Sequence, residues 1–170
     1  DKAFMYAKNK SLKVDNCFLS ELDEGSNYDI FTLFGVLEHL PNPSQIFKDI
    51  RLKANKGALV LAIVPNAYSL YHMFLQSKSV SFDGRNHLLY FSQKTLKELF
   101  EKNGFEVLQL DTLLTGMDNI KKQIQWLDPY QNNNTDKYLN NALVNNCINE
   151  EYILKNNLGL RLRIIAKLKD

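Results

Sequence analysis

The sequence predicts an α/β fold with a mostly parallel sheet, and three observations support this. Apolar runs of strand length recur along the chain, at residues 30–34, 57–64 and 105–110. Segments with helical spacing of apolar residues separate these runs, as expected when parallel strands are joined by helices. The final run, at residues 160–168, alternates apolar and charged residues, which is typical of an outer strand with one side in solvent.

The amino-terminal residues are expected to form a helix, a strand and a loop in turn. Helical spacing places Phe4, Ala7 and Met5 on the inner face of a helix over residues 2–10. Residues 12–18 are predicted to form a short strand, and a polar loop connects it to the next strand.

The strand at residues 30–34 leads into the segment that carries the candidate chemistry. It is apolar on both faces, as in a buried parallel strand. Gly35 follows where the strand ends, and Glu38 and His39 come within the next turn of chain. Open α/β sheets place functional groups at the carboxyl ends of their strands in this way.

Capping residues mark the helices that follow. Asn42 at the N-cap and Pro43 at the first helical position favour a helix start. A short helix is predicted over residues 67–76. Ser92 is expected to cap a further helix, which Gly104 ends.

Residues 115–157 are the least regular part of the chain. Helical patterns at 117–127 and 136–154 flank an Asn-rich loop at 131–134. We interpret this region as a solvated helical insert within a single domain over residues 1–170.

Composition excludes several classes of function. Of the 170 residues 45% are hydrophobic, which suffices for one core, and the net charge of +2 indicates no nucleic-acid surface. The longest apolar run, residues 58–64, is far shorter than the roughly 20 residues that span a bilayer. Cys17 and Cys147 lack metal-ligand spacing. The sequence therefore predicts a cytoplasmic protein with no metal site, no nucleic-acid partner and no membrane span.

Four stretches, in the right order, resemble the class I S-adenosylmethionine-dependent methyltransferases whose fourth-strand motif contains Leu-Glu-His. They cover most of the chain from residue 28 to residue 107: Tyr28–Pro43, Lys56–Asn66, Asn86–Leu96 and Lys97–Val107. The resemblance implies a Rossmann-like methyltransferase fold, with the last strand antiparallel between its neighbours. It also implies S-adenosylmethionine as the cofactor.

The same resemblance indicates that the cofactor half of the domain is missing. The family holds the cofactor with an acidic, glycine-rich loop and with an acidic residue that ends the second strand, and neither has a match here. Residues 1–8 resemble the helix that follows that acidic residue. We therefore expect an N-terminally truncated domain that binds S-adenosylmethionine weakly or not at all and is inactive alone. An uncovered sheet edge would make it dimerise or leave it marginally stable.

The resemblance assigns Glu38 and His39 to catalysis. A histidine titrates near neutral pH, so His39 is suited to deprotonate a hydroxyl or amine during methyl transfer. Some quinone methyltransferases of the family imply a different role, in which both residues help to bind a divalent metal. A purely structural role is also open, in which both side chains cap or brace the turn.

Further site residues follow from the same resemblance. The four expected to contact the cofactor are Phe18, Leu19, Phe34 and Gly35. His87 and Tyr90 lie in a segment that lines the acceptor pocket of relatives, although a histidine there is often only a hydrogen-bonded surface group. His72 and Trp126 have no assigned partner and are expected to serve packing.

Two main functions remain open. The first is methyl transfer to a small hydroxylated or amino acceptor, of the quinone-precursor or surface-glycan type. The second is a non-catalytic binding or scaffold module with a degenerate methyltransferase fold, whose helices at 115–157 form a partner surface. A nicotinamide-dependent dehydrogenase is a weaker third, because its last strand should be parallel.

Overall fold

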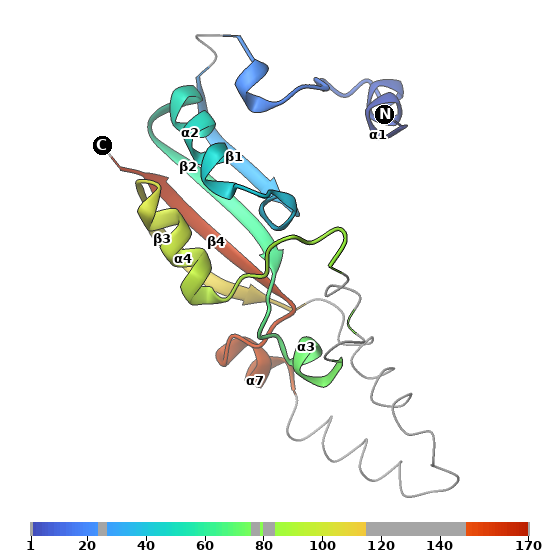
Figure 1. Cartoon of the computed structure of the whole chain (residues 1–170), viewed down its shortest axis with the longest axis vertical. Helices are drawn as coiled ribbons and strands as arrows, with labels where there is room; N and C mark the ends of the chain where they lie inside the picture. Colours follow the sequence, from blue (N-terminus) through green and yellow to red (C-terminus); the bar gives the residue numbers. More distant parts are fainter. Residues whose placement is uncertain (1, 24–26, 76–78, 80–83, 115–148, 170) are drawn as a thin grey trace, which may run out of the picture.

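A four-stranded sheet in the order β1-β2-β4-β3 forms the centre of the computed structural model (Figure 1). The structure describes residues 2–23, 27–75, 79, 84–114 and 149–169, and the statements below concern these residues. The strands are β1 (Tyr28–Phe34), β2 (Ala54–Pro65), β3 (Phe105–Leu113) and β4 (Arg161–Leu168). The predicted α/β sheet is confirmed.

The last strand runs against the other three. β1 pairs with β2 in parallel, and β4 lies between β2 and β3, antiparallel to both. The antiparallel last strand that the resemblance implied is therefore confirmed. The interpretation of residues 160–168 as an outer strand is wrong, because β4 is flanked on both sides. Its alternation arises instead from two unequal faces: Leu162, Ile164 and Ala166 are buried, whereas Arg163 and Ile165 are half-buried.

Two helices, α2 (Pro43–Lys53) and α4 (Gln93–Lys102), cover one face of this sheet (Figure 1). The other described helices are α1 (Lys2–Asn9), α3 (Leu70–Leu75) and α7 (Glu150–Lys155), with 3₁₀ turns η1 (Leu19–Glu21) and η2 (Leu37–His39). Figure 1 shows α2 and α4 on the same face, with α3 and α7 beyond the end of β2. None of the described helices is long and apolar enough to cross a membrane.

Three fully buried phenylalanines join the two covering helices to the sheet. Phe47 of α2 meets Phe100 of α4 with ring centroids 4.8 Å apart, in an edge-to-face arrangement. Phe105 of β3 lies 5.4 Å from Phe47 and 6.1 Å from Phe100. Burial of such a side chain contributes about 1.5–3 kcal/mol, so this cluster holds α2 and α4 in place.

The face of the sheet opposite this cluster is more open. Ile30 and Phe34 of β1, the edge strand, are 63% and 55% exposed. Helix α1 forms as predicted but contains no buried residue, and the expectation that Met5 faces inward is wrong because its side chain is exposed.

The predicted strand at residues 12–18 is not formed. These residues are irregular, and the described sheet ends at β1, so no neighbouring strand pairs with them. A strand requires a neighbouring strand for its backbone hydrogen bonds. Residues 12–18 have no such neighbour, so they form no strand although their sequence suggests one. The predicted loop after it contains the short turn η1.

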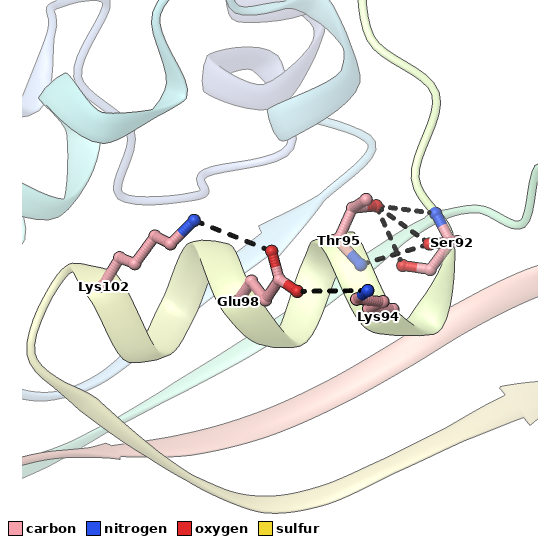
Figure 2. Close-up of polar contacts among 5 residues, drawn as sticks. All are labelled: Ser92, Lys94, Thr95, Glu98 and Lys102. Carbon is pink, nitrogen blue, oxygen red and sulfur yellow. Dashed lines mark hydrogen bonds and ion pairs between the residues drawn. The ribbon is translucent and has the colours of Figure 1, made fainter.

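The predicted helix ends differ in how they are capped. Asn42 occupies the N-cap of α2 and Pro43 its first position, but the Asn42 side chain makes no capping hydrogen bond. Ser92 caps α4 as predicted: Ser92 Oγ accepts from the Thr95 amide at 3.1 Å, and Thr95 Oγ1 accepts from the Ser92 amide at 2.9 Å (Figure 2). Farther along this helix, Glu98 pairs with both Lys94 and Lys102.

Most of the predicted insert lies outside the described residues. This holds for the pattern at 117–127, the Asn-rich loop and Trp126. The carboxyl-terminal part of the pattern at 136–154 coincides with α7, whose N-cap residue, Asn149, accepts a hydrogen bond from the Tyr152 amide at 2.7 Å.

Candidate active site

The site begins where β1 ends, at a turn that requires glycine. Gly35 has a φ angle of +65°, in the left-handed region that residues with a Cβ rarely adopt. Its amide donates to the carbonyl of Ile63 at 3.0 Å, which ties the turn to β2. A Cβ at Gly35 would lie 3.6 Å from Oε1 of Glu38, so the Glu38 carboxylate lies directly beside this turn.

Glu38 is a buried carboxylate in the turn η2. It is only 1% exposed, and its oxygen Oε2 has no hydrogen-bond partner among the described residues. An unsatisfied buried oxygen of this kind costs free energy, so it is rare unless a bound group or a function accounts for it.

The backbone of Glu38 fixes a second segment that is distant in sequence. Its carbonyl accepts hydrogen bonds from the amides of Leu88 and Leu89, at 2.8 and 3.1 Å. These bonds hold the stretch before α4 against η2. They explain how His39 and His87, 48 positions apart in the sequence, come to lie beside one another at this edge of the sheet.

His39 is exposed, and one hydrogen bond determines its tautomer. Its Nδ1 lies 2.6 Å from the carbonyl oxygen of Asn86. A carbonyl can only accept, so Nδ1 carries the proton and the neutral ring keeps its lone pair on Nε2. Nε2 is therefore the atom of His39 that is able to bind a proton or a metal.

The expected acceptor residues converge with Glu38 and His39. The rings of His39 and His87 have centroids 4.9 Å apart, and those of His87 and Tyr90 are 6.5 Å apart. One ligand-type atom each from Glu38, His39 and His87 lies within 4.8 Å of the others. The structure thus brings these predicted residues together, while their roles remain predictions.

The four residues expected to contact the cofactor do not all lie together in the structure. Phe34 and Gly35 lie at the carboxyl edge of β1, beside Glu38. Phe18 is 77% exposed and so forms no packed wall for an adenine ring. Leu19 packs against the hydrophobic core, where its side chain serves the fold.

These residues fit only part of S-adenosylmethionine. The exposed Phe34 and the turn at Gly35 fit an apolar portion of the cofactor. The seven glycines of the sequence are scattered singly, and the described residues contain no glycine-rich loop at a strand end. The described residues therefore lack the backbone cradle that would hold the charged end of the cofactor.

Asn66, directly after β2, is a structural residue that the sequence reasoning missed. Its buried side-chain amide donates to the carbonyls of Asn157 and Gly159, at 3.2 and 2.9 Å. Its Oδ1 accepts from the amide of Tyr68 at 3.1 Å. Asn66 therefore connects the end of β2 to the segment that enters β4. The signal was the Pro-Asn pair that ends the strongest apolar run.

His72 is also more than a packing residue. It is buried, and its Nδ1 lies 2.6 Å from the Asn66 carbonyl. Burial lowers the pKa of His72 below its ordinary value; the hydrogen bond to Asn66 opposes this, and the charge of nearby His87 adds to it. His72 therefore stabilises the turn after β2, at Asn66, as a neutral ring.

A separate cleft of about 410 Å³ lies beside the start of α4. Its lining includes Asn66, Ser92 and Asn157, but none of Glu38, His39 and His87. The cleft and the histidine site are therefore distinct features of the described structure.

Comparison with known families identifies the domain. The methyltransferase domain family matches residues 5–110, which is more than half of the chain. A comparison with curated protein sequences found no significant match.

Solved structures share the fold at low sequence identity. A methyltransferase from Thermotoga maritima, described as a possible histamine N-methyltransferase, has a TM-score of 0.62 at 14% identity, over 100% of this chain and 70% of that one. One from Archaeoglobus fulgidus has a TM-score of 0.59 at 19% identity, over 98% and 72%. Both are S-adenosylmethionine-dependent methyltransferases by description. The chain belongs to the methyltransferase domain family, and it has the fold of these S-adenosylmethionine-dependent enzymes.

Proposed function

We propose that this protein transfers a methyl group from S-adenosylmethionine to a hydroxyl or amino group of a small acceptor, at the site of Glu38, His39 and His87. Family membership supports the reaction class. The observation that supports this choice of site is that the three side chains lie close together at the carboxyl edge of the sheet. Ligands of open α/β sheets bind at this edge.

Among the side chains of this site, His39 is the one suited to take the proton of the acceptor. S-adenosylmethionine supplies a methyl group on a positively charged sulfur. When the acceptor oxygen or nitrogen takes up that methyl group, Nε2 of His39 would receive the proton that the acceptor loses. The Glu38 carboxylate beside it then stabilises the positive imidazolium.

The acceptor class follows from the resemblance of the Leu37-Glu38-His39 segment. It is an aromatic hydroxyl of the quinone-precursor type or a hydroxyl or amine of a surface glycan. The rings of His87 and Tyr90 support this class, because each offers a ring face beside the proposed base against which an aromatic or sugar ring can pack; the two rings are nearly perpendicular, at 80°.

An assay of S-adenosylhomocysteine formation tests the proposal. The probes are 3,4-dihydroxybenzoate and glucosamine, offered to this chain and to the longest natural polypeptide that contains it. Replacement His39→Ala should lower kcat by about 10²- to 10⁴-fold and leave the affinity for S-adenosylmethionine unchanged. His72→Gln is the control, because His72 lies outside the group of ligand-type atoms. Equal losses of kcat and cofactor affinity in His39→Ala would indicate a bracing role.

A non-catalytic binding module is the second candidate. The observation in its favour is that the described residues fit only part of the cofactor and contain no glycine-rich loop. It predicts a folded protein that forms no S-adenosylhomocysteine with either probe.

A further inference from the structure

The cleft of about 410 Å³ beside the start of α4 has the size of a small-ligand site. Its walls come from residues 66–73, which follow β2, from residues 92–94, where α4 begins, and from residues 156–158, which follow α7. The cleft therefore lies at the carboxyl end of β2. Ligands of open α/β sheets bind at this edge of the sheet.

Backbone hydrogen bonds hold the walls of the cleft together. The amide of Ala67 donates to the Phe91 carbonyl at 2.9 Å, which joins the first wall to the stretch before α4. The amide of Leu70 donates to the Leu158 carbonyl, also at 2.9 Å, which joins the first wall to the third. A ligand would therefore meet a pre-formed surface, and little of its binding free energy would be lost in ordering the protein.

The lining combines an apolar surface with side-chain amides. Tyr68 and Met73, which are 64% and 49% exposed, supply much of the apolar part. Gln93 and Asn157 supply carboxamides, and neither of these side chains is hydrogen-bonded to another described residue. A carboxamide both donates and accepts hydrogen bonds. The cleft therefore suits a ligand that has an apolar face and a rim of groups that donate and accept.

A sugar unit has these properties. Its hydroxyl and acetamido groups donate and accept hydrogen bonds, and the C–H groups of its ring pack against an aromatic face. An aliphatic tail, which a quinone precursor can carry, would cover the apolar part but would leave Gln93 and Asn157 desolvated and unpaired, at a cost in free energy. The lining therefore favours the surface-glycan type of acceptor over the quinone-precursor type.

One short stretch of chain connects the cleft to the histidine site. His87 and Tyr90 lie at the histidine site, and Ser92 and Gln93 line the cleft. The backbone at Ser92 is extended, with φ −94° and ψ 168°. Two residues of extended chain span roughly 7 Å, so the cleft begins about one sugar unit beyond Tyr90.

We propose that the cleft binds the sugar unit next to the one that is methylated, so that the acceptor is at least a disaccharide. This inference rests on the proposed function, because the first sugar unit has to lie at the histidine site. The ring of Tyr68 packs against the C–H face of the second unit. The carboxamides of Gln93 and Asn157 hydrogen-bond the hydroxyl or acetamido groups of that unit.

Isothermal titration calorimetry with N-acetylglucosamine and N,N′-diacetylchitobiose tests the sugar subsite without requiring methyl transfer. The two probes are neutral and differ by one sugar unit. The disaccharide should bind roughly tenfold more tightly than the monosaccharide, both to this chain and to the longest natural polypeptide that contains it. Tyr68→Ala and Asn157→Gly should each reduce this ratio about threefold or more. Glycine suits position 157, where φ is +56°, so this variant removes the side chain without backbone strain.

Tyr6→Ala is the matched control for Tyr68→Ala. Tyr6 is 67% exposed, much like Tyr68, but lies on α1 and does not line the cleft. This variant should leave the ratio of the two affinities unchanged. Circular dichroism verifies that each variant is folded.

Three results would overturn the sugar subsite. The first is equal affinity of the folded protein for the two sugars, and the second is a disaccharide advantage that neither cleft variant lowers. The third is tighter binding of 3-geranyl-4-hydroxybenzoate than of 4-hydroxybenzoate, with the gain lost in Tyr68→Ala, because an aliphatic tail would then occupy the cleft.

The same measurements separate this inference from the proposed function. A disaccharide advantage that both cleft variants lower, without formation of S-adenosylhomocysteine, would support the sugar subsite and reject methyl transfer. Formation of S-adenosylhomocysteine with 3,4-dihydroxybenzoate, but no disaccharide advantage, would support methyl transfer and reject the sugar subsite.

Discussion

Glu38 is the residue on which the candidate site depends most. Its side chain is buried next to a glycine turn, and one carboxylate oxygen lacks a partner among the described residues. A residue that only braced the turn would use both oxygens for hydrogen bonds. We therefore propose that Glu38 contacts a bound group, at some cost in the stability of the chain.

Glu38→Gln should stabilise the chain. The amide keeps the shape of the side chain and removes an unsatisfied buried charge, so the free energy of unfolding should rise by about 1 kcal/mol. Glu38→Ala removes side-chain packing as well and should lower it. Urea unfolding measures the stability of both variants. If Glu38→Gln destabilises as much as Glu38→Ala, the structural role is correct.

His72 should make the stability depend on pH. Its pKa in the folded chain is lowered from the ordinary 6.5, chiefly by burial. Between the folded and the unfolded pKa the unfolded chain binds more protons, so the free energy of unfolding should fall as the pH is lowered through this range. His72→Gln should show a smaller loss between about pH 7.5 and about pH 5.5. Equal losses in the two proteins would show that His72 contributes nothing.

At the scale of elements, the helices and strands that could be predicted are those whose own residues mark their ends. β2 is a continuous apolar run ended by proline, and α4 has a serine cap and a glycine stop, so both could be assigned from sequence. Residues 12–18 could not, because a strand exists only where a neighbour pairs with it. The flanked position of β4 was not evident from its alternation and followed only from the resemblance.

The capping box of α4 allows an element-scale prediction. Ser92→Ala removes the acceptor for the Thr95 amide, and the free energy of unfolding should fall by about 1 kcal/mol (Figure 2). Ser92→Asp keeps an acceptor at the same position and should retain most of the stability. Thermal and urea unfolding measure both variants. Equal losses would mean that the serine acts through packing rather than through its cap.

At the scale of the whole molecule, the site exists because two distant segments meet at one edge of the sheet. Sequence motifs identified both the turn after β1 and the stretch before α4. The amides of Leu88 and Leu89 on the Glu38 carbonyl, and the Asn86 carbonyl at His39, could not be predicted, because they depend on how the two segments pack. The orphaned oxygen of Glu38 emerges only from that packing.

The open face of β1 belongs to the same scale. Its exposed Ile30 and Phe34 lie on the edge strand of the described sheet, close to the turn that begins the site. An exposed apolar edge of this kind favours pairing with another strand. We propose that two copies of the chain pair through this edge.

Amide chemical-shift mapping tests the central claim most directly. The labelled chain is titrated with S-adenosylhomocysteine and then with 3,4-dihydroxybenzoate or glucosamine, at concentrations that reveal weak binding. The account predicts that the largest shifts fall on residues 34–39 and 86–90, where the site lies. Shifts concentrated instead around Asn66, Ser92 and Asn157, which line the separate cleft, would contradict it.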